Sequence, residues 1–182
     1  MNNVQSDYQI CSRCVMDSSD PLITFSKEEG YCNHCTDYLK IRIGYINQDP
    51  LDDKPLKDLF NQIKKKGVGK KFDCVIGMSG GVDSSYLAVL AANHGLRVMC
   101  VHLDNGWNSP VAVENIRALV EKLKFSYSSN VLPWSSFRKV QLAFLKASVP
   151  EAETPTDVAI QRAVHDIALK YKISYILSGG NV

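Results

Sequence analysis

The central motif of the sequence is Phe72-Asp-Cys-Val-Ile-Gly-Met-Ser-Gly-Gly-Val-Asp-Ser-Ser-Tyr86. Its first part, residues 73–78, is a short apolar run of the kind that forms strands in parallel sheets covered on both faces. Ser79-Gly80-Gly81 then breaks the run, and Ser84 opens a segment with apolar residues at helical spacing that ends at Gly95. The motif therefore predicts a buried strand, a glycine-rich turn and a helix in immediate succession.

Such a turn is suited to binding an anion. Two adjacent glycines let the backbone turn sharply and bring its N–H groups against a bound group. The helix that follows directs the positive end of its dipole to the same place, and Ser79, Ser84 and Ser85 add hydroxyl donors. The pattern favours a pyrophosphate cradle over the simpler interpretation, a Gly-Gly turn that only caps a helix.

The order of residues is more specific than the turn itself. Ser79-Gly80-Gly81-Val82-Asp83-Ser84 is a complete SGGxDS signature and resembles the loop of the PP-loop ATP pyrophosphatase superfamily. It is not a Walker A loop, and Gly67-Val-Gly-Lys-Lys71 lacks the length and the Ser/Thr of one. The resemblance implies an adenine nucleotide alpha hydrolase-like fold and an enzyme that cleaves ATP between the α and β phosphates, passing AMP to a substrate oxygen.

The resemblance also implies the cofactors ATP and Mg²⁺ and a set of site residues. Asp83 and Ser84 are the candidate catalytic residues, and Asp83 either holds Mg²⁺ or turns back onto the loop backbone. The segment from His102 to Asp104 is expected near the adenosine, and the turn at Gly179 near the phosphates or ribose. The full set of expected nucleotide-binding residues is Ser79, Gly80, Gly81, Val82, Asp83, Ser84, Ser85, His102, Asp104 and Gly179.

Four of the six cysteines form two CxxC pairs, Cys11/Cys14 and Cys32/Cys35. Their spacing is typical of a four-cysteine zinc ribbon or knuckle, in which Zn²⁺ completes a tetrahedron and stabilises a small fold. An iron–sulfur cluster and a redox pair are the alternatives. His34 lies between two ligands and is expected to be a bystander.

Three segments are predicted: a zinc module over residues 1–48, a linker and helix over 49–71, and an ATP-binding α/β domain over 72–182. Alternating strands and helices predict a doubly wound parallel sheet, whose ligands bind beyond the carboxyl ends of the strands. The polar turns at Ser79, Asp104 and Gly179 should therefore converge, although Asp104 also fits an ordinary Asp-Asn-Gly turn. Hairpin character is expected over 21–25, strands over 97–103, 125–131 and 173–177, and helices over 55–66, 110–123, 135–147 and 156–171.

Composition bears on the binding partners and the cellular location of the protein. A net charge of +2 is too mild to indicate nucleic-acid binding. The chain has neither a signal-peptide pattern at its start nor an apolar run of the roughly 20 residues needed to span a membrane, so a cytoplasmic location is expected.

The four-cysteine module, the loop and the turn Leu103-Asp-Asn-Gly-Trp107 together resemble the N-acetyl sugar amidotransferases of bacterial surface-polysaccharide (O-antigen) synthesis. Further likeness lies in Cys11-Ser-Arg-Cys-Val-Met16, Glu29-Gly-Tyr-Cys-Asn-His-Cys35 and Pro155-Thr-Asp-Val-Ala-Ile160. The resemblance implies that ATP activates the N-acetyl group of a nucleotide- or lipid-linked sugar, and that ammonia from a separate glutaminase subunit converts it to an acetamidino group. Asp157 and His165 are candidates for the sugar side. Family members are longer, so a C-terminally truncated chain is expected.

The sequence is also compatible with two other functions. A tRNA-thiolating PP-loop enzyme uses the same adenylation but needs reactive cysteines, whereas Cys74 and Cys100 lie in predicted strands and should be buried and inert. The second alternative is a nucleotide-binding module without catalysis of its own.

Overall fold

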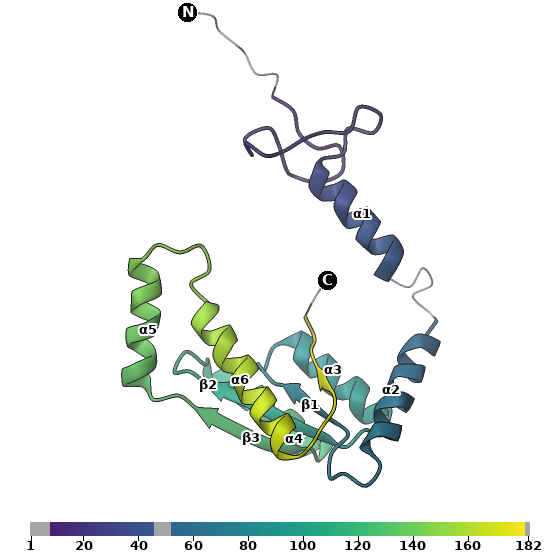
Figure 1. Ribbon diagram of the computed structural model, residues 1–182, viewed down its shortest axis with the longest axis vertical. Coiled ribbons are helices and arrows are strands. Elements are labelled where there is room, and N and C mark those ends of the chain that lie inside the picture. The colour runs from purple at the N-terminus through teal and green to yellow at the C-terminus, as the bar shows by residue number, and fades with distance from the viewer. Residues whose placement is uncertain (1–7, 46–51, 181–182) are drawn as a thin grey trace, which may run out of the picture. The chain divides into compact units, whose positions relative to one another are not determined.

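The computed structural model describes residues 8–45 and 52–180, which belong to two compact units, Met1–Asp53 and Lys54–Val182 (Figure 1). The second unit is built on one sheet of four strands. Its strands are β1 (Cys74–Gly77), β2 (Val98–Asp104), β3 (Ser126–Val131) and β4 (Ile176–Leu177), and its helices are α2 (Lys54–Gly67), α3 (Val82–Asn93), α4 (Pro110–Leu123), α5 (Trp134–Lys146) and α6 (Thr154–Lys170).

All strand pairs are parallel, and the strand order is β3-β2-β1-β4. The chain moves outward from β1 to β3 and then returns to the other side of β1, so the order switches between β1 and β4. The carboxyl ends at such a switch are where doubly wound sheets bind ligands. This parallel α/β architecture confirms the predicted fold class.

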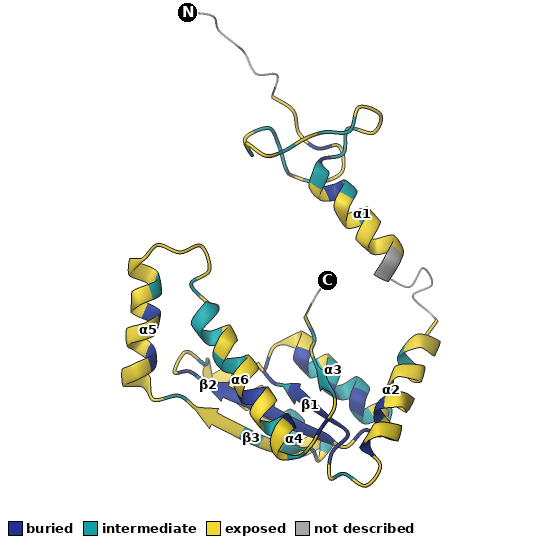
Figure 2. Cartoon of the chain, in the orientation of Figure 1, coloured by how far each residue is buried: buried dark blue, intermediate teal, exposed yellow. Residues whose placement is uncertain are grey.

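Helices cover both faces of the sheet, as the burial colours in Figure 2 show for β1 and β2. On one face, Phe60 and Ile63 of α2, Ala88 and Ala91 of α3 and Ile116 of α4 pack against the central strands. On the other face, α6 supplies the cover. Its buried residues are Ala163, Val164 and Ala168, which pack with Val75, Met99 and Val101 of the sheet.

The two outer strands differ from the apolar central pair. β3 has the sequence Ser-Tyr-Ser-Ser-Asn-Val and is largely exposed, because it lies at the edge of the sheet and needs few apolar residues. β4 pairs with β1 only at Ile176 and Leu177, so it is shorter than the expected strand over 173–177. Helix α3 begins at Val82, two residues before its predicted start at Ser84.

One ion pair fixes the amino ends of the central strands. Asp73 is 4% exposed, and the guanidinium of Arg97 reaches it through Nη2 at 2.6 Å and Nε at 3.1 Å. Arg97 also donates to the carbonyls of Gly67 and Lys70, which ties the turn after α2 to the sheet. Burial alone raises the pKa of Asp73, but the hydrogen bonds and charge of Arg97 outweigh it and hold that pKa below its usual value.

The first unit is small and is organised by its cysteines. Helix α1 (Asn33–Tyr45) follows a segment with two isolated antiparallel bridges, Ile10 to Asp17 and Phe25 to Cys32. No strand is present among its described residues, so the hairpin character expected over 21–25 is limited to the bridge at Phe25. The predicted boundary at 48/49 lies outside the described residues.

Among the residues described, no helix combines the length and apolar character that crossing a membrane requires.

Candidate functional site

The turn after β1 is held by hydrogen bonds among its own residues. The Ser79 and Ser84 hydroxyls lie 3.1 Å apart, and the Gly81 N–H donates to Ser79 Oγ. The Ser85 hydroxyl donates to the Gly81 carbonyl at 2.7 Å. Because these bonds join residues close in sequence, the loop holds its shape without help from a ligand.

The same loop leaves backbone donors free. Within the described part of the chain, the N–H groups of Gly80, Val82 and Asp83 donate to no protein group. They lie at the start of α3, where the helix dipole is positive and the first N–H groups have no intrahelical acceptor. Free donors at this position form a site for an anionic group.

Gly80 is fixed by its neighbours as well as by its backbone angle. Its φ is +79°, in the left-handed region, and a Cβ there would overlap the backbone carbonyl of Ala112 at the start of α4. The Asn115 side chain donates to the Gly80 carbonyl at 3.3 Å. Helix α4 begins at this place because the Ser109 hydroxyl accepts from Ala112 N–H and Pro110 follows it, as the sequence predicts.

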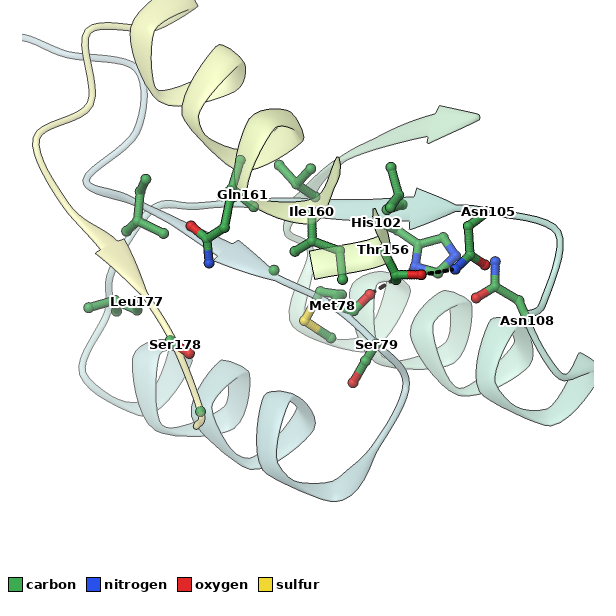
Figure 3. A pocket seen from close by; sticks show the side chains of 16 residues that line it. Met78, Ser79, His102, Asn105, Asn108, Thr156, Ile160, Gln161, Leu177 and Ser178 are labelled. Atoms are coloured by element: carbon green, nitrogen blue, oxygen red, sulfur yellow. Dashed lines mark hydrogen bonds between the residues drawn. The ribbon is translucent and has the colours of Figure 1, made fainter. Parts of the chain in front are cut away.

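A cavity of about 320 Å³ opens beside the loop at the switch between β1 and β4. Part of its wall is apolar and includes Met78, Ile160 and Leu177. Polar side chains from four segments also line it, and Figure 3 shows several of them around the opening. They are Ser79, His102, Asn105, Asn108, Thr156, Gln161 and Ser178.

His102 has a defined role for each ring nitrogen. Nδ1 lies 2.8 Å from the Met78 carbonyl, which can only accept, so Nδ1 carries the proton. Nε2 is buried, and no described residue pairs with it. In the neutral ring Nε2 is therefore an acceptor beside the cavity, ready for a ligand N–H or O–H group.

The turn after β2 is organised by its acidic and amide side chains. Asp104 Oδ1 accepts from the Gly106 N–H and from Asn108 Nδ2, both at 3.0 Å. Asn105 is 8% exposed and donates to the Thr156 hydroxyl at 3.2 Å, which joins this turn to α6. The Asp104 carboxylate thus shapes the Asp-Asn-Gly turn, and the neighbouring amides face the cavity.

The structure brings together part of the predicted nucleotide set. Ser79, His102 and Gly179 line the cavity, whereas Asp104 does not. The rest of the loop adjoins it: a Cβ on Gly179 would lie 3.0 Å from the backbone of Asp83. Ser84 is buried, while Val82 and Asp83 are exposed.

Sequence reasoning missed the lining residues Asn105, Asn108, Thr156 and Gln161. Among these four residues, only Asn105, in the turn at 103–107, and Thr156, in the segment 155–160, lie in sequence patterns that could have indicated a place in the site. Of the sugar-side candidates, Asp157 and His165 are both exposed and outside this lining.

The four cysteines of the first unit form a tight cluster. Their sulfur atoms all lie within 4.8 Å of one another, with 3.8 Å between Cys11 and Cys35 and 3.6 Å between Cys14 and Cys32. A tetrahedron of metal–sulfur bonds of about 2.3 Å has edges of roughly 3.8 Å. The cluster therefore has dimensions that suit a single tetrahedral ion, whereas a cluster of several irons would hold the sulfurs further apart.

The surroundings of the cluster favour a thiolate at Cys11 but not at Cys14. Burial alone raises the pKa of Cys11, but backbone N–H groups, including those of Cys32 and Arg13, outweigh it and lower that pKa to about 6. A backbone hydrogen bond from Met16 lowers the pKa of Cys14, but hydrogen bonds with the neighbouring cysteine thiols and burial outweigh it and raise that pKa to about 12. His34 is not part of the cluster, because its Nε2 lies 3.2 Å from Asp20 Oδ2.

The remaining two cysteines lie in the central strands of the sheet. Cys74 in β1 and Cys100 in β2 have no exposed surface, and burial raises the pKa of each thiol to about 12. The expectation that both are buried is confirmed.

A family comparison identifies the second unit. The NAD synthase family model matches residues 55–157, which is more than half of the chain and includes the loop, β1 to β3 and the start of α6. The chain belongs to the NAD synthase family. This match and the relatives below place it in the PP-loop ATP pyrophosphatase superfamily, as the SGGxDS signature predicts.

Curated relatives match over shorter regions. A glutamine-hydrolyzing GMP synthase from Chlamydia caviae is 45% identical over 62 residues, covering 34% of this chain and 12% of the relative. A second, from Bdellovibrio bacteriovorus, is 35% identical over 88 residues, covering 46% of this chain and 17% of the relative. The matches therefore span less than a fifth of these relatives' length.

Solved structures support the fold. NMN synthetase from Francisella tularensis superposes with a TM-score of 0.50 at 19% identity, covering 65% of this chain and 50% of the other. Glutamine-dependent NAD⁺ synthetase from Acinetobacter baumannii, solved with ADP, gives a TM-score of 0.54 at 18% identity, covering 69% of this chain and 23% of the other. At these identities the likeness concerns the fold alone.

Proposed function

We propose that the chain is the nucleotide-binding part of an ATP-dependent amidotransferase that converts the N-acetyl group of a sugar to an acetamidino group. The observation that carries the ATP-dependent step is the loop at Ser79, whose free N–H groups lie beside the cavity at the β1–β4 switch. The sugar is supported by the sequence resemblance of the four-cysteine module, the loop and the turn at residues 103–107.

The loop residues would hold the leaving pyrophosphate. N–H groups of Gly80, Val82 and Asp83 would donate to phosphate oxygens, and the dipole of α3 would stabilise their charge. The nucleoside would occupy the cavity, where His102 Nε2 accepts from a donor of the base or ribose. Because the loop is already shaped by its own hydrogen bonds, little reorganisation would accompany binding.

The chemistry takes two steps. The acetamido oxygen attacks the α-phosphorus of ATP, and the bond to the β-phosphate oxygen breaks, releasing pyrophosphate and leaving an O-adenylyl imidate. Ammonia then adds to the imidate carbon, AMP leaves with the former amide oxygen, and a proton is lost to give the amidine. Placement of the reactants and stabilisation of the pyrophosphate charge are the contributions that this chain would make.

Asp83 is the residue that would hold Mg²⁺. Its carboxylate makes no hydrogen bond within the described residues, so it is not occupied by the loop backbone. It is exposed at the first turn of α3, and carboxylate oxygens together with phosphates are the usual ligands of Mg²⁺. The ion supplies charge neutralisation for the phosphates when bound.

Zn²⁺ would be held by Cys11, Cys14, Cys32 and Cys35 as a structural ion. All four ligand positions can come from sulfur, which leaves no open position for chemistry. Among the residues of this unit that the structure describes, few apolar ones pack around the cluster, so metal binding would supply much of the folding energy.

Ammonia would come from a separate glutaminase subunit. The cysteines outside the cluster, Cys74 and Cys100, are buried with raised pKa values and are unsuited to nucleophilic attack on glutamine. The same burial argues against direct sulfur delivery, as tRNA thiolation needs. The glutamine-hydrolyzing relatives support an ammonia-dependent reaction.

Calorimetric titration with MgATP tests the nucleotide site. Wild-type chain should bind, and Asp83→Asn and Ser84→Ala should bind much more weakly with unchanged circular dichroism. Asp166→Asn, which changes an Asp on the surface of α6, is the matched control and should bind as wild type. Wild-type chain that is folded and zinc-loaded but binds no MgATP would contradict the proposal.

The reaction itself is assayed with the chain, MgATP, an N-acetylated sugar and ammonium chloride, which bypasses the glutaminase. AMP release and a sugar whose oxygen is replaced by NH in its mass spectrum are expected. ATP binding without sugar-dependent AMP release would support a nucleotide-binding module instead.

A further inference from the structure

A second cavity, of about 260 Å³, adjoins the first. It is lined by Asn105, Trp107, Gln141, Leu145, Ala152 and Glu153, which come from the turn after β2, from α5 and from the segment before α6. Asn105 lines both cavities, so the two share a wall. None of the other five residues has a place in the nucleotide site described above.

Gln141, which lines this cavity, carries an unpaired acceptor. The side chain is only 8% exposed, and its Nε2 donates to the Ala152 carbonyl at 2.6 Å. Since a carbonyl can only accept, this bond fixes which end of the amide is nitrogen. Oε1 is buried and has no partner among the described residues. Because a buried acceptor without a partner is destabilising, a ligand N–H or O–H group is its natural complement.

The other lining groups have complementary chemistry. Trp107 is 65% exposed, and its indole packs edge-to-face against that of Trp134 with 5.4 Å between the ring centroids. This contact helps to hold the Trp107 indole in place. Its backbone N–H donates to Asn105 Oδ1, so the position of Trp107 is tied to the wall between the cavities. Glu153 adds an exposed carboxylate that accepts hydrogen bonds and repels anions.

We propose that this second cavity binds the sugar ring of the acceptor, an inference that rests on the proposed function. Sugar hydroxyls donate to Gln141 Oε1 and to Glu153, while an apolar C–H face of the ring lies on the Trp107 indole. A phosphate is disfavoured because Gln141 Oε1 and Glu153 both present acceptors. A purine offers few donors for two acceptor groups, whereas a sugar carries several. Because Asn105 lines both cavities, a ring bound here lies next to the nucleotide cavity, where a substituent of the ring would meet the activated phosphate.

Trp107 supplies its own reporter for the test. The chain has two tryptophans, and Trp134→Phe leaves Trp107 as the single indole while keeping an aromatic ring behind it. In this background, N-acetylglucosamine and N-acetylgalactosamine are titrated while Trp107 fluorescence is recorded, and MgATP affinity is measured separately by calorimetry. Gln141→Leu and Glu153→Gln are then introduced, with Gln62→Leu on the exposed side of α2 as the matched control.

A saturable fluorescence change with at least one sugar is expected. Gln141→Leu and Glu153→Gln should each lower the affinity for that sugar by about fivefold, which corresponds to the loss of one hydrogen bond, and should leave the affinity for MgATP unchanged. Gln62→Leu should change neither. Because Gln141→Leu also removes the bond to Ala152, its melting temperature is compared with that of Glu153→Gln, whose side chain is exposed.

Three results would overturn the inference: no Trp107 response to either sugar, a sugar affinity that neither substitution changes, or a loss of MgATP affinity in both variants, which would place the base in this cavity. Failure of the proposed function is separate. It would show as a wild-type chain that binds MgATP but gives no sugar-dependent AMP release.

Discussion

Replacing Gly80 with alanine should remove nucleotide binding, and Gly69→Ala provides its matched control. Both glycines have left-handed backbones, with φ of +79° and +77°. For an alanine this conformation costs about 1–2 kcal/mol of stability. At Gly69 nothing lies within 4 Å of the added Cβ, so this backbone cost is the whole effect.

At Gly80 the added Cβ meets the backbone of α4. It would lie 2.8 Å from both Cα and C of Ala112, and nearer still to its carbonyl oxygen. Carbon atoms in ordinary contact are about 3.5–4.0 Å apart, so the loop or the start of α4 must move by roughly 1 Å. Such a shift would misdirect the free N–H groups. Losing two hydrogen bonds to a charged phosphate, at about 1.5–3 kcal/mol each, weakens binding by more than about 100-fold.

The assay combines thermal melting with calorimetric titration of MgATP. Gly69→Ala should melt a few degrees below wild type, at roughly 4 °C per kcal/mol, and bind MgATP normally. Gly80→Ala should melt lower still and show no measurable binding while remaining folded. If folded Gly80→Ala binds MgATP about as well as Gly69→Ala does, the loop is not the phosphate site and the reasoning fails.

Three further predictions concern the metal, the ion pair and the buried thiols. Purified chain should contain a single zinc ion by atomic absorption, and Cys32→Ser should lose it. A metal-free wild-type chain that keeps the fold of its first unit would refute a structural ion. Asp73→Asn should lower the free energy of unfolding at pH 7 by about 2–3 kcal/mol, below the range for a fully buried pair because the Arg97 side chain is 49% exposed. Because the pKa of Asp73 is lowered in the folded protein, the ionised carboxylate adds stability above its unfolded pKa near 3.9, and this stability is lost as pH falls through the folded pKa. Urea titrations should therefore show the free energies of unfolding of wild type and Asp73→Asn converging in acid. A stability deficit of the variant that persists at low pH would contradict the ion-pair account. Cys74 and Cys100 should resist iodoacetamide in the native protein and react in denaturant, as mass spectrometry can show; rapid native labelling would mean that the strands open.

The loop could be predicted from the sequence because its geometry is local. Every residue that shapes it lies between Ser79 and Ser85, apart from the contacts of Gly80 with α4. The four-cysteine cluster could also be predicted, since two short CxxC turns and their spacing indicate that the thiols meet at one point.

The cavity lining could not be predicted in the same way. Thr156 and Gln161 reach the cavity only because α6 crosses the face of the sheet beside β1 and β2, which no local pattern specifies. The role of Asp104 was also ambiguous, because an Asp-Asn-Gly sequence serves a turn and a ligand equally well. Its hydrogen bonds to Gly106 and Asn108 show that the carboxylate shapes the turn.

The self-contained hydrogen bonding of the Ser79 loop has an evolutionary consequence. A segment that fixes most of its own shape can be inherited as a unit, because changes elsewhere, apart from those at the start of α4, leave its hydrogen bonds in place. The second cavity is built instead from the turn after β2 and from Gln141 and Glu153, which come much later in the chain and share no hydrogen bond with the loop. Selection can therefore exchange one acceptor for another by altering those later segments while the nucleotide chemistry stays intact. Divergence of substrate within a family that retains one phosphate loop is the expected result.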